Sequence, residues 1–316
     1  MHIPDTVLPA GTVAAAAAVS GGVVAYAMVR TRRDLGERAA PVMGVLAACV
    51  FAIQMLNFPI GIGVSGHPLG AALTTAVLGP WGGIVVMTVV LAVQALVFQD
   101  GGVLALGANV LNVVVIGCGA AYVVFDEIRR RVGGRAGVVA GATVGAWFSI
   151  FLGAAACAVE LATRPDVTLL QALGPMLLLH AVIGVAEALV TGLAVGYLSA
   201  LRPDLIHQAE PGGRYQAVGR FTVLGLVVAI SVVVLLAPFA SSLPDALERT
   251  LDRLAIAAEG AEPIVAAPMP DYSIGVFRNA MLAGAVAGTV GVLITFALAS
   301  ALALRARRHE GRASHH

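Results

Sequence analysis

The chain has 316 residues, of which 59% are hydrophobic and only 12% are charged, and its formal net charge is +1. A soluble domain averages roughly 25% charged residues, so the composition excludes a soluble globular protein and offers no basic surface for nucleic acid. All 19 basic residues are arginine, and without a lysine the chain can neither build a P-loop nor form a Schiff base.

Apolar stretches of about 20 residues recur along the whole sequence, which predicts an all-α polytopic membrane protein. No Lys or Arg precedes the first stretch, so we interpret it as a retained helix and not as a signal peptide. The stretch 67–79 is short for a full crossing, and we expect it to be partly re-entrant or tilted. The expected spans are about 8–29, 41–58, 67–79, 81–98, 103–125, 136–160, 169–199, 220–238 and 279–304.

Arginine is distributed unevenly between the segments that connect these spans, and this predicts the orientation of the chain. With the N-terminus outside and nine crossings, fifteen of the 19 Arg residues fall in cytoplasmic segments, in agreement with the positive-inside rule. Merging 67–79 with 81–98 would place Arg129–Arg135 outside, so we keep these two spans separate. The N-terminus and the loop 59–67 then lie on the same outer face, and the C-terminus is cytoplasmic.

A change of composition near residue 200 predicts two domains. Residues 1–200 are expected to form a seven-helix transmembrane body. The polar segment 201–219 is rich in Pro and Gly and is expected to be a cytoplasmic linker. Residues 220–308 then form a two-helix hairpin whose connecting segment, 240–278, is extracytoplasmic.

The first two residues and one distant histidine have the chemistry of a metal site. The α-amino group of Met1, the peptide nitrogen of His2 and the His2 imidazole can hold one ion in fused chelate rings, and His67 would complete a planar set of four nitrogens. Such a set suits Ni(II) or Cu(II), with Co(II) also possible, and leaves little affinity for Mg or Ca. A chance His at position 2 is the competing interpretation.

Polar residues inside the expected spans form the other candidate groups. His180 and Glu187 lie two helical turns apart on one face of the helix 169–199, and Glu187 is the only acidic residue well inside an apolar stretch. A proton relay of these two residues would make the chain a self-sufficient secondary metal transporter, which is the alternative function. Four amide side chains also lie within or beside apolar stretches: Gln54, Asn57, Asn109 and Asn112. We expect them either to form hydrogen bonds between helices or to contact the imidazole ligands. No His-Glu-x-x-His pattern exists, so no metalloprotease activity is expected.

Several motifs in order resemble the CbiM/NikM proteins, the substrate-binding components of energy-coupling-factor cobalt and nickel importers. The resemblance covers about residues 1–200. It is carried by Met1–Asp5, Phe51–Pro59, Ser65–His67, Gly79–Trp81, Asp100–Gly102, Leu106–Asn109 and His180–Glu187. The tail resembles the small partner protein of the same systems, because Pro244–Glu248 is similar to its Pro-Asp-Gly-Leu-Glu signature, with Ala246 in place of Gly. Asp271-Tyr272 matches a second element of the partner's loop.

The resemblance implies a function and a set of partners. It implies that the Met1 amine, the His2 amide and imidazole, and His67 bind Ni(II) or Co(II) as the transported substrate. It also implies that a transmembrane coupling (T) protein and two ATP-binding cassette subunits supply the energy, so that this chain binds no nucleotide, and that the tail assists metal loading. The location would be the cytoplasmic membrane of a prokaryote, in contact with lipid. The residues expected around the ligands are Gln54, Asn57, Ser65, His180 and Glu187.

Overall fold

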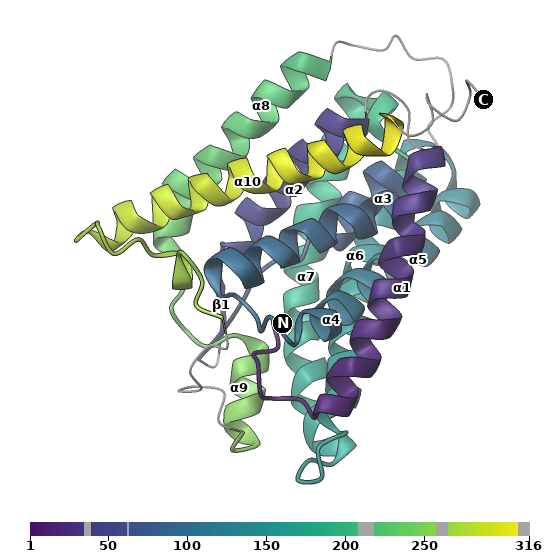
Figure 1. Ribbon diagram of the computed structural model, residues 1–316. Coiled ribbons are helices and arrows are strands. Elements are labelled where there is room, and N and C mark those ends of the chain that lie inside the picture. Colours follow the sequence, from purple (N-terminus) through teal and green to yellow (C-terminus); the bar gives the residue numbers. More distant parts are fainter. Residues whose placement is uncertain (35–38, 62, 208–217, 257–264, 309–316) are drawn as a thin grey trace.

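The computed structural model describes residues 1–34, 39–61, 63–207, 218–256 and 265–308 (Figure 1). Within these ranges the chain is mostly helical, and seven helices are long and apolar enough to cross a membrane. The expected all-α polytopic fold is therefore confirmed. Three parts of the expected layout lie outside the described residues: 208–217 of the linker, 257–264 of the outer segment and the C-terminal 309–316.

In the described part of residues 1–207, the body has seven helices and one small sheet that the sequence did not predict. π-Helical turns extend α3 over Gln94–Phe98 and join α4 to α5 over Val110–Ile116. The antiparallel hairpin of β1 and β2 ends directly before His67. The elements are α1 (Ala10–Asp34), α2 (Ala39–Gln54), β1 (Phe58–Gly61), β2 (Val64–Gly66), α3 (Ala71–Val93), α4 (Leu106–Asn109), α5 (Gly117–Val132), α6 (Gly134–Leu161) and α7 (Leu169–Leu201).

Helix α3 reverses its direction at Gly79. This residue has φ 74° and ψ 176°, which are not helical values, and Pro80 follows it. A Cβ atom on Gly83 would lie 3.0 Å from Thr75 Oγ1, whereas residues eight apart in a straight helix are about 12 Å apart. The two arms of α3 therefore lie side by side, at the point where the sequence predicted the boundary between two spans.

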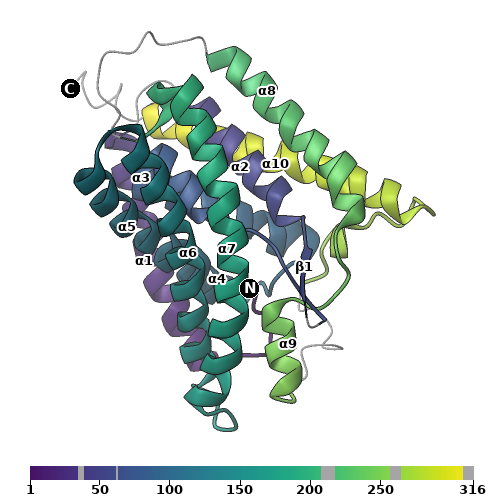
Figure 2. The same ribbon diagram turned by 180° about the vertical axis from the view of Figure 1, so that it is seen from behind.

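The tail contributes α8 (Val218–Ser231), α9 (Ala246–Arg253) and α10 (Ala280–Arg308). Helix α10 packs along α2, where a Cβ atom on Gly44 would overlap Ser300. Across the same contact, Gly291 leaves room for the ring of Phe51. Small residues at such contacts let membrane helices approach closely. The short helix α9, which the sequence did not predict, lies beside α7 (Figure 2).

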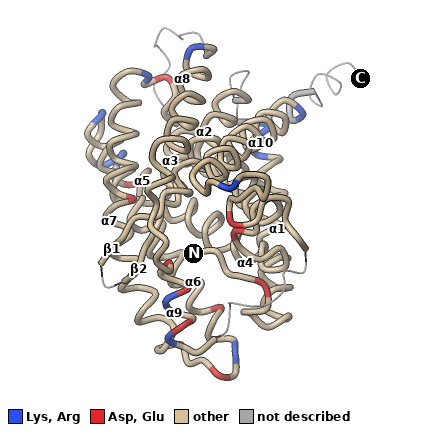
Figure 3. The backbone as a smooth tube through the Cα atoms, turned by 90° about the vertical axis from the view of Figure 1, so that its left-hand side faces the viewer, with Lys and Arg blue, Asp and Glu red and all other residues tan. Residues whose placement is uncertain are grey.

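The outer surface of the bundle is apolar. Large side chains of α7 point outward, with Leu170 81% and Leu193 75% exposed. Figure 3 shows that charged residues gather mainly near the helix ends and in the connecting segments. An apolar surface of this kind is stable only against lipid or another membrane protein. The interior, in contrast, encloses the N-terminal segment, in which Met1 is 3% and Ile3 0% exposed.

Candidate metal centre

The N-terminal segment is held inside the protein by its backbone. The Asn109 side chain accepts a hydrogen bond from Ile3 N (2.7 Å) and donates one to Ile3 O (3.0 Å). The Gly102 N–H donates a second hydrogen bond to Ile3 O at 2.9 Å. Because both backbone groups of Ile3 are satisfied by fixed partners, the two residues before it have a defined position.

A second anchor lies two residues further on. Asp5 Oδ1 accepts hydrogen bonds from Leu104 N at 2.9 Å and Ala105 N at 3.1 Å, and Oδ2 accepts one from Val103 N at 3.2 Å. The carboxylate thus satisfies three backbone N–H groups of the segment that leads into α4. The fit is close, since a Cβ atom on Gly102 would overlap Asp5.

The Met1 amine is paired with a carboxylate of the tail. It donates a hydrogen bond to Asp245 Oδ2 at 2.9 Å. Met1 lines a small cavity together with His67, Ile150 of α6 and His180 of α7. Burial by itself would lower the pKa of this amine, but Asp245 outweighs burial and the pKa is raised. Burial by itself would raise the pKa of Asp245, and the ammonium group holds it well below its usual range.

His67 is placed by the hairpin before it and by α7 behind it. The Ser65 N–H donates to Pro244 O at 2.9 Å, and Ser65 Oγ donates to Leu243 O at 2.6 Å. After His67, the Glu187 carboxylate of α7 accepts hydrogen bonds from the backbone of residues 69 and 70. Burial, together with the positive amine, lowers the pKa of His67 to about 3. The ring is therefore neutral and its nitrogen is available as a ligand.

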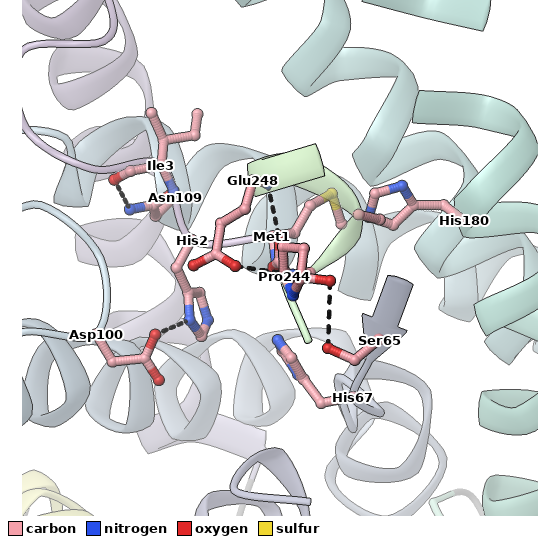
Figure 4. Close-up of polar contacts among 12 residues, drawn as sticks. Met1, His2, Ile3, Ser65, His67, Asp100, Asn109, His180, Pro244 and Glu248 are labelled. Carbon is pink, nitrogen blue, oxygen red and sulfur yellow. Dashed lines mark hydrogen bonds and ion pairs between the residues drawn. The ribbon is translucent and has the colours of Figure 1, made fainter. Parts of the chain in front are cut away.

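His2 and His67 lie next to each other, with ring centroids 5.3 Å apart (Figure 4). His2 Nδ1 is hydrogen-bonded to Asp100 Oδ1 at 2.6 Å, and Tyr272 of the tail donates to Asp100 Oδ2 at 2.5 Å. Among the residues that the structure describes, His2 Nε2 is buried and has no hydrogen-bond partner, which is unusual for a buried polar atom.

A cavity of about 1000 Å³ separates the body from the tail at this point. It is lined by His2, His67, Asp100, Asp245 and Tyr272, among others. Gln54 and Asn57 line it too, and each has a buried side-chain oxygen without a hydrogen-bond partner. The cavity thus has histidine nitrogens, carboxylates and unpaired amide oxygens on its wall, a lining that favours a cation over an anion.

The structure brings Met1, His2 and His67 together, as the sequence predicted. Most of the other candidate residues form hydrogen bonds that stabilise the surrounding backbone. Gln54 Nε2 donates to Leu69 O at 2.6 Å, and His180 Nδ1 is hydrogen-bonded to Met176 O at 2.7 Å. Asn112 Nδ2 donates to Glu160 Oε2 at 2.6 Å.

Four residues with contacts in or near this region had no predicted role. Asp100 and Asp245 contact the nitrogens of His2 and Met1, and Tyr272 contacts Asp100. Asp100 and Tyr272 belong to motifs noted in the sequence, but nothing in the spacing assigned them a contact. Glu160, the second-last residue of α6, is a further buried acid, whereas Glu187 lies well inside α7.

A metal site here has to use backbone nitrogens as well as side chains. Among the described residues, no group of three or more His, Cys, Asp or Glu side chains has metal-ligand spacing. In the chelate described above, the amine and the His2 amide close a five-membered ring with the ion, and the amide and imidazole close a six-membered ring only through Nδ1. Since Nδ1 faces Asp100 in this structure, the ring has to turn when an ion binds.

These features define a polytopic membrane protein with an internal cavity whose wall carries histidine nitrogens and carboxylates. The chain belongs to the CbiM family: the family described as the cobalt uptake substrate-specific transmembrane region matches residues 2–205, and a PDGLE domain matches residues 219–308. It is therefore a member of a metal transport family and not an enzyme.

Similar proteins agree with this assignment. A protein of Archaeoglobus fulgidus, provisionally named as the fused nickel transport protein NikMN, is 34% identical over 97% of this chain and 99% of its own length. The cobalt transport protein CbiM of Sorangium cellulosum is 33% identical over 66% of this chain and 96% of its own length. A crystal structure described as a truncated transition metal transporter has a TM-score of 0.58 and 32% identity, and covers 63% of this chain and 99% of that chain.

Proposed function

We propose that the chain is the substrate-capture subunit of an ATP-driven importer of Ni(II) or Co(II), in the cytoplasmic membrane of a prokaryote. It binds one ion at the outer face through the Met1 amine, the His2 amide and imidazole, and His67. The observation that carries the proposal is the meeting of these three residues inside the protein, where the two rings lie 5.3 Å apart and the Met1 amine is buried beside them. Relatives with nickel or cobalt transport names support the choice of ion.

The orientation proposed is the one that the arginine distribution predicts, with the N-terminus outside and the C-terminus in the cytoplasm. The energy source proposed is external: a transmembrane coupling protein and two ATP-binding cassette subunits. The support for this is the absence of lysine from the chain, because a P-loop needs a lysine to reach the nucleotide phosphates.

The alternative, a secondary transporter that uses His180 and Glu187, has less support. The Glu187 carboxylate accepts hydrogen bonds from two backbone amides and from Thr191, and His180 is hydrogen-bonded within its own helix. Contacts of this kind indicate a structural role for both residues and not a proton relay. Metal uptake without any ATPase subunit, abolished by Glu187→Gln, is the result that would establish this alternative.

The test of the proposed site changes the chelate and leaves the rest of the protein intact. Insertion of one glycine between Met1 and His2 breaks the fused rings, so Ni(II) titration of the purified protein should show loss of high-affinity binding. Insertion of one glycine after Ala280, at the start of α10, is a matched control that should leave binding unchanged. Equal Ni(II) affinity of the first variant and the wild type would refute the site.

A further inference from the structure

Two residues of the tail reach the chelating nitrogens of the body. Asp245 Oδ2 lies 2.9 Å from the Met1 amine. Tyr272 donates to Asp100 Oδ2 at 2.5 Å, and the other oxygen of Asp100 is 2.6 Å from His2 Nδ1. Two of the three chelating nitrogens therefore have a carboxylate beside them, and each of these carboxylates either belongs to the tail or is held by it.

Asp245 has a rigid position. It is the N-cap residue of α9, where its Oδ1 accepts a hydrogen bond from Glu248 N at 2.8 Å and the Glu248 side chain accepts one from Asp245 N at 2.8 Å. This reciprocal capping box leaves Oδ2 free for the amine. Helix α9 is docked by Leu247 and Leu251, each 1% exposed, so the cap cannot drift away from the body.

The same segment of the tail is attached to the strand that leads to His67. Ser65 pairs with the chain at residues 243–245 through its backbone N–H and its hydroxyl. The carboxylate beside the Met1 amine and the backbone before His67 thus belong to one hydrogen-bonded unit.

The Asp245 carboxylate beside the Met1 amine can balance the charge of a bound metal ion. The Met1 and Asp245 side chains are 1% and 18% exposed, and a buried charge without a partner is costly. An ammonium group carries one positive charge. A divalent ion bound to a neutral amine and a deprotonated peptide nitrogen also carries a net charge of one, so the Asp245 carboxylate balances either.

We propose that Asp245 is a positioning residue of the metal site: it holds the Met1 amine and balances the charge of the bound ion. The tail is then part of the site as well as a neighbour of it. This inference rests on the proposed function, because it assigns roles around the same ligands.

The test is Asp245→Asn in the full chain, with Ni(II) as the probe. Asn is as good an N-cap residue as Asp, so α9 keeps its cap while the charge is lost. We expect Ni(II) affinity to fall roughly 10- to 100-fold, the size of a lost charge-assisted contact, and the absorption bands of the bound ion to shift. The thermal unfolding midpoint without metal should stay close to that of the wild type.

The matched control is Glu248→Gln. Glu248 lines the same cavity and carries the same charge, and Gln at this position preserves the capping box. Its side chain contacts the backbone of Asp245 and not the amine, so Ni(II) affinity should change less than about twofold.

The possible results separate this inference from the proposed function. Unchanged affinity of Asp245→Asn, with a wild type that binds, overturns the positioning role alone. Equal losses in Asp245→Asn and Glu248→Gln that disappear in high salt indicate general attraction and also overturn it. If Asp245→Asn does not fold, Asp245→Ser, a second neutral N-cap, decides in the same way. A wild type that binds no Ni(II) refutes the proposed function itself.

Discussion

The carboxylate of Glu187, in α7, accepts a hydrogen bond at 2.9 Å from the backbone N–H of Gly70, the N-cap residue of α3. Its second oxygen accepts one from Leu69 N at 2.8 Å. Glu187 thus caps the amino end of α3 from α7, at a depth where unsatisfied backbone groups are costly. Because His67 lies two residues before Leu69, the cap also determines where the His67 ring is held.

Glu187→Gln should therefore destabilise the protein and weaken metal binding together. An amide can accept only one of the two backbone hydrogen bonds, which costs about 1–3 kcal/mol of the free energy of unfolding. The looser loop at His67 should lower Ni(II) affinity roughly tenfold. Thermal unfolding and Ni(II) titration measure both effects. Glu127→Gln, at an exposed acid paired with Arg131, is the control and should change neither.

Loss of the His67 ring should weaken binding while the fold stays intact. His67→Ala removes one of four nitrogen ligands, and we expect Ni(II) affinity to fall by at least about 100-fold, the upper end of the effect seen for outer-shell partners. The absorption spectrum of any ion still bound should change, since its ligand set has changed. Circular dichroism and gel filtration check the fold. A misfolded His67→Ala protein, or one with wild-type affinity, would contradict the role of His67 as a ligand.

Asn109, which forms two hydrogen bonds with the backbone of Ile3 and is not a ligand, should affect metal binding indirectly. Asn109→Ala leaves the Ile3 N–H buried and unpaired, so the N-terminal segment should loosen and Ni(II) affinity should fall about tenfold. Asn279→Ala is a matched control, because Asn279 Oδ1 accepts a hydrogen bond from Met281 N near the exposed start of α10. That variant should lose a helix cap and keep its affinity. Equal affinities in the two variants would show that the Asn109–Ile3 hydrogen bonds have no part in metal binding.

Lower pH should weaken metal binding. The raised pKa of the Met1 amine keeps it protonated at neutral pH, whereas His67, with a pKa of about 3, remains neutral. An ion therefore has to displace one proton from the amine and one from the His2 peptide nitrogen, and affinity should fall about 100-fold for each unit by which the pH is lowered. Titration calorimetry in buffers with different ionisation enthalpies counts these protons. Affinity that does not change across the neutral range would argue against the chelate.

Much of the architecture could be predicted from the sequence because its cause is local. Apolar stretches long enough to span a bilayer predict the helices wherever they occur, and the separation of 67–79 from 81–98 coincides with the reversal at Gly79. The central part of the site is also local, because Met1 and His2 are covalently adjacent and their nitrogens are always within chelating distance. The motifs around them were enough to identify the family.

The remaining contacts were decided by tertiary structure. Asp245 reaches Met1, and Tyr272 reaches Asp100, only because the tail folds back on the body. Asp100 meets His2 across 98 residues of the body itself, and no spacing in the chain encodes these contacts. The role of Glu187 could not be predicted from the sequence. An acid inside an apolar helix is compatible with a proton relay and with a cap on a neighbouring helix, and only its partners distinguish the two roles. The sequence by itself therefore determined the helices, the family and the chelating pair. The surrounding carboxylates came from packing, because only packing brings together groups that are far apart in the chain.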